Sequence, residues 1–388
     1  MARMIHFLKN ARHNVIALKY LFEQEKNSQS NLNLGKKIWC LLHGFSSEKY
    51  ELYDFKRNNY RLYLSDFKRR KTAKINGPYS LLINDKKLFS KVLPATNLTA
   101  EIYGHVKDGK IILANHERSF DEFCDFLAGQ KKLIIKKLRS GAGKGIYRLS
   151  NENGHFCLDG KSTSLNTLSD FIKTLSDHLI VEHLTQAAYA NKIYPGTINS
   201  IRIITMRDPD TDHVFIPIAV HKFGSDKTKP VDNVRNGGVT SLIDLNTGRL
   251  EKAAYHHENN KKIEWIQTHP DTNVKIEGTV IPHWDKFKNN VLEVAQSEDE
   301  LKYVGWDVVV MDNGIKIIEG NNYSDVNILQ IYQPLLVDDR VRKFYQYPWH
   351  YLGRLDRLFY DAQFQPIIGI QTFSGTSIQK EQHKRDDQ

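Results

Sequence analysis

The sequence of 388 residues has little cysteine and no long hydrophobic run, and both absences narrow what the protein can be. Its three cysteines, Cys40, Cys124 and Cys157, are odd in number and far apart. This argues against a disulfide framework or a zinc site and favours a reducing, cytoplasmic compartment. No stretch of about 18 apolar residues appears, so no membrane-spanning helix is predicted. The first 20 residues carry four scattered basic side chains and no cleavage-like site, unlike a secretory signal.

Positive charge is concentrated in the first quarter of the chain. Residues 1–95 hold 19 Lys/Arg and 7 Asp/Glu, a formal charge of +12, so the remainder carries −2 of the total of +10. Such a surface suits an anionic sugar, a nucleotide, an acidic lipid or nucleic acid, or is simply solvated. No nucleic-acid-binding motif appears, so no nucleic-acid partner is expected. Peripheral contact of this basic region with a membrane stays open.

The composition, 40% hydrophobic and 26% charged, is that of a soluble globular protein with room for two or three lobes. Helices are expected at 5–25, 52–70, 120–128 behind the capping box Ser119–Glu122, 165–177, 286–295 and 338–346. Strands are expected at 133–138, 179–184, 201–206, 213–221, 239–245 and 250–255. Together they predict a small α+β unit followed by a larger, mainly antiparallel sheet.

Residues 305–322 predict a β-hairpin on which the rest of the interpretation depends. Two β-branched runs flank Asp312-Asn313-Gly314, and Asn and Gly tolerate the positive φ of a tight turn. With these three residues as the loop, Asp307 lies directly opposite Glu319. Asn321 follows Glu319 by two residues and shares its face of the strand.

This hairpin would place two carboxylates and an amide at one point. A two-residue loop would shift the register and put Asp307 opposite Gly320. Paired carboxylates repel each other and are costly to desolvate, and a hard divalent cation removes that penalty. Mg²⁺ takes one or two carboxylates and completes its shell with water and substrate phosphates. The alternative is that Asp307 and Glu319 lie on opposite faces of an exposed sheet.

A glycine-rich loop at 139–145 connects two expected strands. It is not a P-loop, because Lys144 is followed by Gly145 and the loop leads into a strand rather than a helix. Four cations, Lys136, Lys137, Arg139 and Lys144, accompany it, a pattern that suits a polyphosphate. The alternative is a plain hairpin turn.

These motifs occur in the order typical of the ATP-grasp superfamily, which the chain resembles over roughly residues 80–345. The superfamily resemblance rests on Lys136, the loop ending at Gly145, the strand 180–184, Arg202, Asp307, Glu319 and Asn321. Val231-Asp232-Asn233, Gly237-Gly238, 269–272, Pro282, Trp284 and Gly305-Trp306-Asp307 resemble the sugar-transfer-associated, exopolysaccharide-linked family, related to alpha-L-glutamate ligases.

The resemblance implies an α+β ATP-grasp fold, in which a small lid and a larger antiparallel-sheet lobe clamp ATP. The expected division is a basic, mainly helical region (1–78), an N-terminal subdomain or linker (79–112), a lid (113–185), a catalytic subdomain (186–370) and a polar tail (371–388).

The resemblance also implies a role for each motif residue. The ATP phosphates would be bound by Lys86, by one of Lys136 and Lys137, which strand alternation turns to opposite faces, and by Ser140, Gly141, Gly143, Lys144 and Gly145. Glu182, His183 and Leu184 would read the adenine, and Gln186 would replace the ribose-binding acid. Asp307, Glu319 and Asn321 would hold one or two Mg²⁺, or Mn²⁺. Arg202, Lys222 and Asn199 would be catalytic, and Asp232, Asn233, Gly237, Gly238 and His221 would contact substrate.

These roles imply an ATP-dependent carboxylate–amine ligase that forms an amide through an acyl phosphate. Its substrates would be an amine, such as an amino acid, and a small or sugar-linked acid of surface-glycan biosynthesis, and its partners glycan-assembly enzymes. A kinase acting on a sugar or alcohol and a non-catalytic nucleotide-binding protein are the alternatives. A stable phosphoester product would distinguish the kinase from the ligase.

Overall fold

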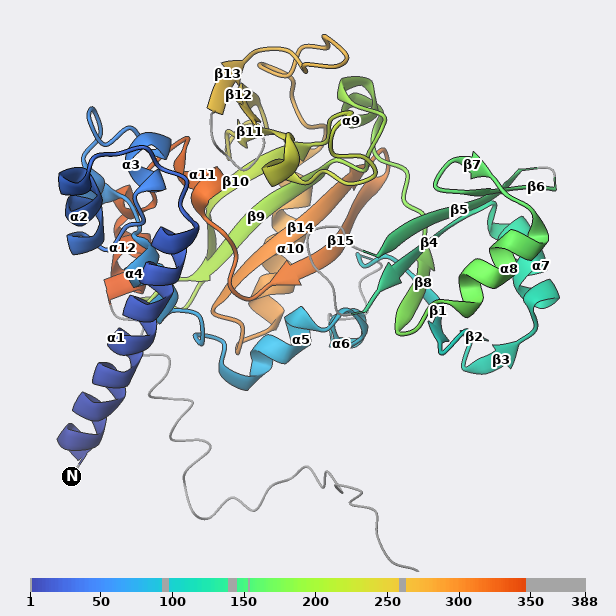
Figure 1. Ribbon diagram of the computed structural model, residues 1–388, viewed down its shortest axis with the longest axis horizontal. Helices are drawn as coiled ribbons and strands as arrows, with labels where there is room; N and C mark the ends of the chain where they lie inside the picture. The colour runs from blue at the N-terminus through green and yellow to red at the C-terminus, as the bar shows by residue number, and fades with distance from the viewer. Residues whose placement is uncertain (1, 93–97, 139–144, 153, 258–262, 347–388) are drawn as a thin grey trace, which may run out of the picture.

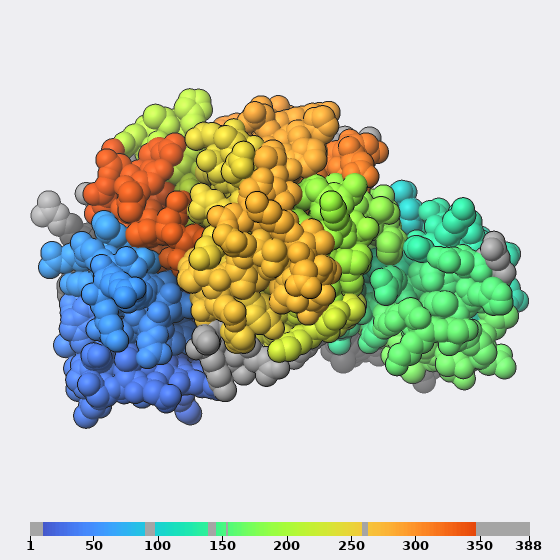
Figure 2. Space-filling view, turned by 90° about the horizontal axis from the view of Figure 1, so that it is seen from above, coloured from blue at the N-terminus to red at the C-terminus, as the bar shows by residue number. Residues whose placement is uncertain are grey.

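The computed structural model describes residues 2–92, 98–138, 145–152, 154–257 and 263–346. Figure 1 shows three parts in a row: a group of helices at the N-terminus, a large central sheet and a smaller sheet at the opposite end. The space-filling view from above shows the same succession, with the N-terminal residues at one end and the smaller sheet at the other (Figure 2). Within the described stretches, no helix is both long enough and apolar enough to cross a bilayer.

The N-terminal part is a group of short helices around an aromatic core. Its elements are α1 (Ala2–Asn27), α2 (Leu34–Leu42), α3 (Glu48–Leu52), η1 (Tyr60–Leu62) and α4 (Asp66–Lys71). The helix expected at 5–25 is confirmed within α1, but a continuous helix at 52–70 is wrong. Asp54, two residues after the end of α3, has a positive φ of 47°, and Ser65 caps the start of α4. The aromatic side chains between these helices, including Tyr53 and Tyr63, pack against one another instead.

The smaller sheet is antiparallel, in the order β3-β2-β1-β8-β4-β5-β6-β7. Its strands are β1 (Ile102–Lys107), β2 (Lys110–Leu113), β3 (His116–Arg118), β4 (Lys132–Lys137), β5 (Ile146–Glu152), β6 (His155–Leu158), β7 (Lys161–Ser162) and β8 (His178–Glu182). Helices α7 (Phe120–Gln130) and α8 (Leu165–Lys173) pack on it around Leu133, Ile135 and Ile180. The predicted capping box at Ser119 and Glu122 is confirmed.

The large sheet is also antiparallel, in the order β13-β12-β11-β10-β9-β14-β15. Its strands are β9 (Ser200–Arg207), β10 (Val214–Phe223), β11 (Val239–Ile243), β12 (Leu250–His256), β13 (Ile263–Ile266), β14 (Tyr303–Met311) and β15 (Gly314–Asn321). One face packs against α10 (Trp284–Ser297). The other meets α11 (Asn327–Gln330), α12 (Asp339–Gln346) and the N-terminal helices, through contacts that include Leu64 and Ile75.

The two sheets lie close together at one crossing of the chain. Strand β8 ends at Glu182, and the backbone N–H of Ala187 already donates to Val310 O of the large sheet. Helices α5 (Ser80–Asn84) and α6 (Lys86–Val92) lie beside the same region (Figure 1). Functional groups on the two sheets can therefore meet across this crossing. The domain boundaries themselves stay a prediction.

Candidate active site

Asp307 and Glu319 lie opposite each other as predicted, but the loop length and the strand register that bring them together differ from the prediction. Met311 pairs with Gly314, so the loop is Asp312-Asn313 and not three residues long. Continued without interruption, this register would place Ile318 opposite Asp307. A β-bulge at Ile318 adds one residue to β15, and Glu319 takes the position opposite Asp307. The predicted pair is confirmed, whereas the predicted loop is wrong.

Two cations from the neighbouring strands hold Asp307. Arg202 on β9 lies opposite Asp307 and donates to both carboxylate oxygens, at 2.8 and 2.9 Å. Lys222 Nζ on β10 lies 3.1 Å from Asp307 Oδ1. Burial alone would raise the pKa of Asp307, but the charges of Arg202 and Lys222 outweigh it and hold that pKa well below its usual range. Asp307 is therefore an anion at neutral pH.

Glu319 is the contrasting member of the acid pair. Its carboxylate makes no hydrogen bond or ion pair with any residue in the described part of the chain. Burial and the nearby charge of Asp307 raise the pKa of Glu319. Asn321 lies beside the pair, with Nδ2 3.5 Å from Asp307 Oδ2 and 3.2 Å from Gly305 O.

This donor set fits a magnesium ion. The structure has no group of three or more His, Cys, Asp or Glu with metal-binding geometry among its described residues. Mg²⁺ does not need one, because it takes one or two carboxylates and otherwise keeps water or phosphate oxygens. Within the described ranges, Glu319 has no hydrogen-bond or ion-pair partner and faces a second carboxylate, so its negative charge is the one that a cation would balance.

Lys136, rather than Lys137, turns toward the acid pair. Burial and the charge of Lys86 lower the pKa of Lys136 to about 8, while Glu319 acts in the opposite direction. Lys86, Lys136 and Glu319 are thus electrostatic neighbours, contributed by α6, the smaller sheet and the large sheet. The Lys137 side chain is exposed, and its backbone N–H donates to Gly145 O. Successive strand residues face opposite ways, which explains the difference.

Asp232 belongs to the same cluster. Its Oδ2 accepts from Ser200 N at 2.9 Å and Ser200 Oγ at 2.5 Å, and it lies 3.7 Å from Lys222 Nζ. Asn233 caps the short helix η3 (Val234–Asn236) by accepting from Arg235 N. Gly237 follows with φ of 104°, a conformation that favours glycine, and Gly238 comes next. The loop thus places Asp232 in the cluster and uses Asn233 for its own shape.

His221 is not brought to the cluster. It follows Val220 and precedes Lys222 on β10, so its side chain points to the opposite face of the sheet, where it stacks on Phe223 with ring centroids 4.1 Å apart. Tyr189 Oη lies 2.9 Å from its Nε2, and its Nδ1 donates to Lys222 O at 3.2 Å. Burial lowers the pKa of His221 to about 3, so the ring is neutral.

Asn199 and Gln186 are engaged with each other and with the turn before β9. Asn199 N donates to Gln186 Oε1 at 2.9 Å, and the Gln186 amide donates to Tyr194 O and Thr197 O. The Asn199 amide donates to Tyr194 O at 2.7 Å. Both side chains are buried and use their hydrogen-bonding groups inside the protein, so neither reaches the cluster.

The residues expected to bind adenine lie at the crossing between the sheets. Glu182 accepts from Glu101 N at 3.1 Å and lies 3.4 Å from Lys316 Nζ. His183 follows, its pKa lowered by burial and by the charges of nearby cations, and Leu184 is buried. Of the glycine-rich loop, Gly145 has a positive φ of 69°. The other four expected phosphate-binding residues of that loop lie outside the described residues: Ser140, Gly141, Gly143 and Lys144.

Ser324 and Arg69 complete the site, although no local sequence pattern marks either residue. Arg202 Nη1 donates to Ser324 Oγ at 2.8 Å. Arg69 on α4 donates to the backbone oxygen of Ser324 from Nε at 3.1 Å and from Nη2 at 2.9 Å. A side chain at Gly305 would collide with Ser324. The N-terminal helices therefore hold the segment that contacts Arg202.

A family profile matches most of the chain. Proteins described as sugar-transfer associated ATP-grasp match residues 66–344. No curated protein matches the chain.

Solved structures resemble the chain at low identity. D-alanyl-alanine synthetase A from Vibrio cholerae O1 biovar eltor is similar at 9% identity and a TM-score of 0.43, over 72% of this chain and 67% of that one. D-alanine–D-alanine ligase from Bacillus anthracis is similar at 13% identity and a TM-score of 0.35, over 70% of each chain. The ATP-grasp ligase PsnB, complexed with a phosphomimetic variant of its minimal precursor, Mg and ADP, gives 14% and 0.33 over 69% of this chain. The match spans 61% of the PsnB chain.

Proposed function

The chain belongs to the sugar-transfer-associated ATP-grasp family, and from this premise we propose that it is an ATP-dependent carboxylate–amine ligase. The observation that carries the proposal is the asymmetric acid pair. Asp307 is neutralised by Arg202 and Lys222, whereas Glu319 faces it with no hydrogen-bond or ion-pair partner among the residues that the structure describes. Two cations and a metal-binding carboxylate at one point suit the transfer of a phosphoryl group.

Each residue of the cluster has a distinct part in this proposal. Lys136 and Lys86 bind ATP phosphates from the side of the smaller sheet. Asp307, Glu319 and Asn321 hold one or two Mg²⁺ ions, or Mn²⁺. When bound, the metal neutralises phosphate charge and orients the γ-phosphoryl group.

The reaction proceeds in two steps. A carboxylate oxygen of the acid substrate attacks the γ-phosphorus of ATP, ADP leaves, and an acyl phosphate forms. The amine then attacks the acyl carbon, phosphate leaves, and the nitrogen loses a proton as the amide forms. Arg202 and Lys222 stabilise the negative charge that develops on the transferring group and on the tetrahedral oxygen. His221 takes no part, because its ring lies on the opposite face of the sheet.

The substrates are an amine, such as an amino acid, and a small or sugar-linked carboxylate. Enzymes that assemble surface glycans are the corresponding partners, in the cytoplasm. The basic N-terminal region is a candidate surface for peripheral membrane contact. The family description supports the sugar-linked substrate and the glycan-assembly partners, and the +12 formal charge of residues 1–95 supports the membrane contact.

The test measures ADP and phosphate release with pairs of candidate acids and amines. A ligase releases both products only when the acid and the amine are present together, and the amide appears by mass spectrometry. ATP consumption that never depends on both partners contradicts the proposal. A stable phosphoester, with no free phosphate, identifies a kinase instead.

Replacing each of the two adjacent lysines, Lys136 and Lys137, in turn should show which one binds phosphate. We expect Lys136→Met to weaken ATP binding by about tenfold or more, because a charge-assisted contact from a half-buried lysine to phosphate is lost. Lys137→Met should change the dissociation constant by less than about twofold, since that side chain is exposed on the other face. Calorimetric titration of each variant with ATP and Mg²⁺ measures both. Equal losses in the two variants would contradict the assignment.

ATP binding should also depend on pH. Burial and the charge of Lys86 lower the pKa of Lys136 to about 8, and phosphate binds the protonated form. Affinity should therefore be full below this pKa and decline as the pH rises from about 7 to about 9. Lys136→Arg should flatten this part of the profile, because a guanidinium stays charged. An unchanged profile in Lys136→Arg would assign the dependence to another group.

A further inference from the structure

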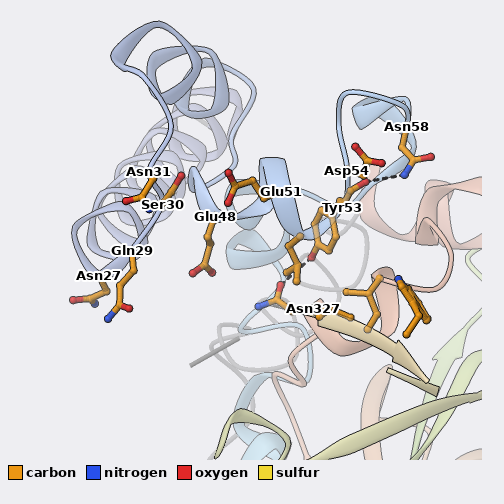
Figure 3. Close-up of a pocket in the computed structure, with 14 residues that line it drawn as sticks. Asn27, Gln29, Ser30, Asn31, Glu48, Glu51, Tyr53, Asp54, Asn58 and Asn327 are labelled. Atoms are coloured by element: carbon orange, nitrogen blue, oxygen red, sulfur yellow. Dashed lines mark hydrogen bonds between the residues drawn. The ribbon is translucent and has the colours of Figure 1, made fainter. Parts of the chain in front are cut away.

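A cavity of about 710 Å³ lies between the N-terminal helices and the edge of the large sheet. The end of α1 with the segment that follows it forms one wall together with the helix α3, as Figure 3 shows. Asn27, Gln29, Ser30 and Asn31 lie on the former, and Glu48 and Glu51 on α3. The opposite wall includes Ile263 and Trp265 of β13 and Asn327 of α11. No residue of the acid pair or of the cation cluster lines it.

The lining of this cavity suits neutral hydroxyl groups. It contains carboxylates, amides and hydroxyls, and no Lys, Arg or His among its 14 residues. Two of its three acids already have a cation: Glu48 pairs with Lys49, and Asp54 lies 3.8 Å from Arg57. The electrostatic attraction of the cavity for a cationic ligand is therefore weak, and its carboxylates repel a phosphate or an acid. Carboxylate and amide oxygens accept hydrogen bonds from hydroxyls, and amide N–H groups donate to them.

Several of these groups have no partner among the residues that the structure describes. In the described part of the chain, the side chains of Gln29, Asn31 and Glu51 make no hydrogen bond or ion pair. Trp265 is 44% exposed, and its ring contacts Tyr332 edge-on at 5.2 Å between centroids. An exposed indole beside unpaired polar groups offers both an apolar surface and hydrogen bonds, as a sugar ring requires.

The cavity and the acid cluster share one face of the large sheet. Lys222 pairs with Thr240, Thr240 with Ala254, and Ala254 with Trp265. Directly paired residues point to the same side, so Trp265 faces the same way as Lys222. Three strand spacings separate them, or about 14 Å. A ligand with more than one unit can span this distance.

Hydrogen bonds connect the floor of the cavity to Arg202. Tyr53 Oη donates to Asn327 Oδ1 at 2.9 Å, and Asn327 N donates to Asp325 Oδ1 at 3.0 Å. Asp325 follows Ser324, whose Oγ accepts from Arg202. The residues that line the cavity thus also fix the segment beside the cluster.

We propose that this cavity binds a neutral, hydroxyl-rich glycosyl group, the sugar-linked part of a substrate whose reacting group lies at the Asp307 cluster. The binding half of this proposal stands on the cavity alone. The connection to substrate rests on the proposed function.

The test titrates the full-length protein, without nucleotide, with the neutral trisaccharides triacetylchitotriose, maltotriose and mannotriose. Saturable binding of at least one is expected by calorimetry, and Trp265→Ala should weaken it by about tenfold. Trp265→Phe should restore most of the affinity, because an aromatic ring is kept. The control is Leu165→Ala, an equally exposed apolar side chain on α8, which should bind like the parent. Thermal unfolding verifies that the variants remain folded.

Spermidine and inorganic phosphate serve as opposing probes. The proposal is overturned if none of the trisaccharides binds at millimolar concentration, if Trp265→Ala leaves their binding unchanged, or if spermidine or phosphate binds instead in a Trp265-dependent manner. Failure of the two proposals is distinguishable. Sugar binding without turnover of any acid–amine pair removes the ligase, whereas turnover with no Trp265-dependent binding removes the cavity.

Discussion

Glu319→Gln is expected to reduce the ATP-dependent reaction by about a thousandfold or more while leaving the ligand-free protein as stable as the parent, or more stable. The reason is that Glu319 has no protein partner in the described structure. Burial and the charge of Asp307 raise its pKa, so its ionised form is unfavourable in the folded state at neutral pH. The neutral amide removes this repulsion together with a metal-binding charge.

Asp307→Asn should lower both the rate of the ATP-dependent reaction and the stability of the ligand-free protein. It leaves Arg202 and Lys222 without their shared carboxylate, and removal of one partner from a buried ion pair costs about 3 kcal/mol or more. Urea unfolding without ATP and Mg²⁺, combined with ADP release, measures the contrast. Asp170→Asn is the control, because Asp170 is 76% exposed on α8 and, among the described residues, pairs only with Lys173. Destabilisation by Glu319→Gln as large as that by Asp307→Asn would refute this account of the site.

Arg69→Ala is expected to lower the free energy of unfolding by about 3–5 kcal/mol and the turnover of the remaining folded protein by about ten- to hundredfold. Arg69 is buried, lies 3.9 Å above the Tyr323 ring and donates to the backbone oxygens of Tyr323 and Ser324. Its loss leaves these oxygens without a side-chain donor in the described part of the chain. It also removes the strongest of the positive charges that stabilise Asp325, which keeps Lys49 and Arg235 nearby. Ser324 would then no longer position Arg202.

The control for this prediction is Lys68→Ala, the exposed neighbour on the same helix, which should change stability by less than about 0.5 kcal/mol. Arg69→Lys should recover only part of the stability, because an ammonium cannot reproduce the forked contacts of a guanidinium. A turnover number unchanged in folded Arg69→Ala would show that the N-terminal helices only stabilise the fold and do not position the site.

The sequence was sufficient for the acid pair because its information is local. Because the two strands pair around a short turn, Asp307 and Glu319 must lie at or near the same level of the hairpin, whatever the rest of the fold is. The loop length was wrong, and the bulge at Ile318 compensated for that error. Sequence pattern cannot locate such a bulge, because the extra residue, Ile318, is apolar like Ile317 before it and nothing marks it as the unpaired one.

The remaining site residues depend on information that the sequence does not carry locally. His221 and Lys222 are adjacent on a strand, so only one can face the cluster, and the choice depends on which face α10 covers. Arg69 meets Ser324 across 255 positions, and no spacing rule relates them. Gln186 and Asn199 have the polar character of ligand-binding residues, but tertiary packing turned both inward.

The kink in β15 has a consequence for protein design. Suppose that this hairpin were designed without the bulge, with the same two-residue loop and the same sequence. Ile318 would then lie opposite Asp307, and the Glu319 side chain would point to the opposite face of the sheet. Such a hairpin would be more regular, but it would no longer have the pair of carboxylates that could bind a cation. Anyone who transplants this hairpin to another scaffold must copy its irregularity along with its sequence.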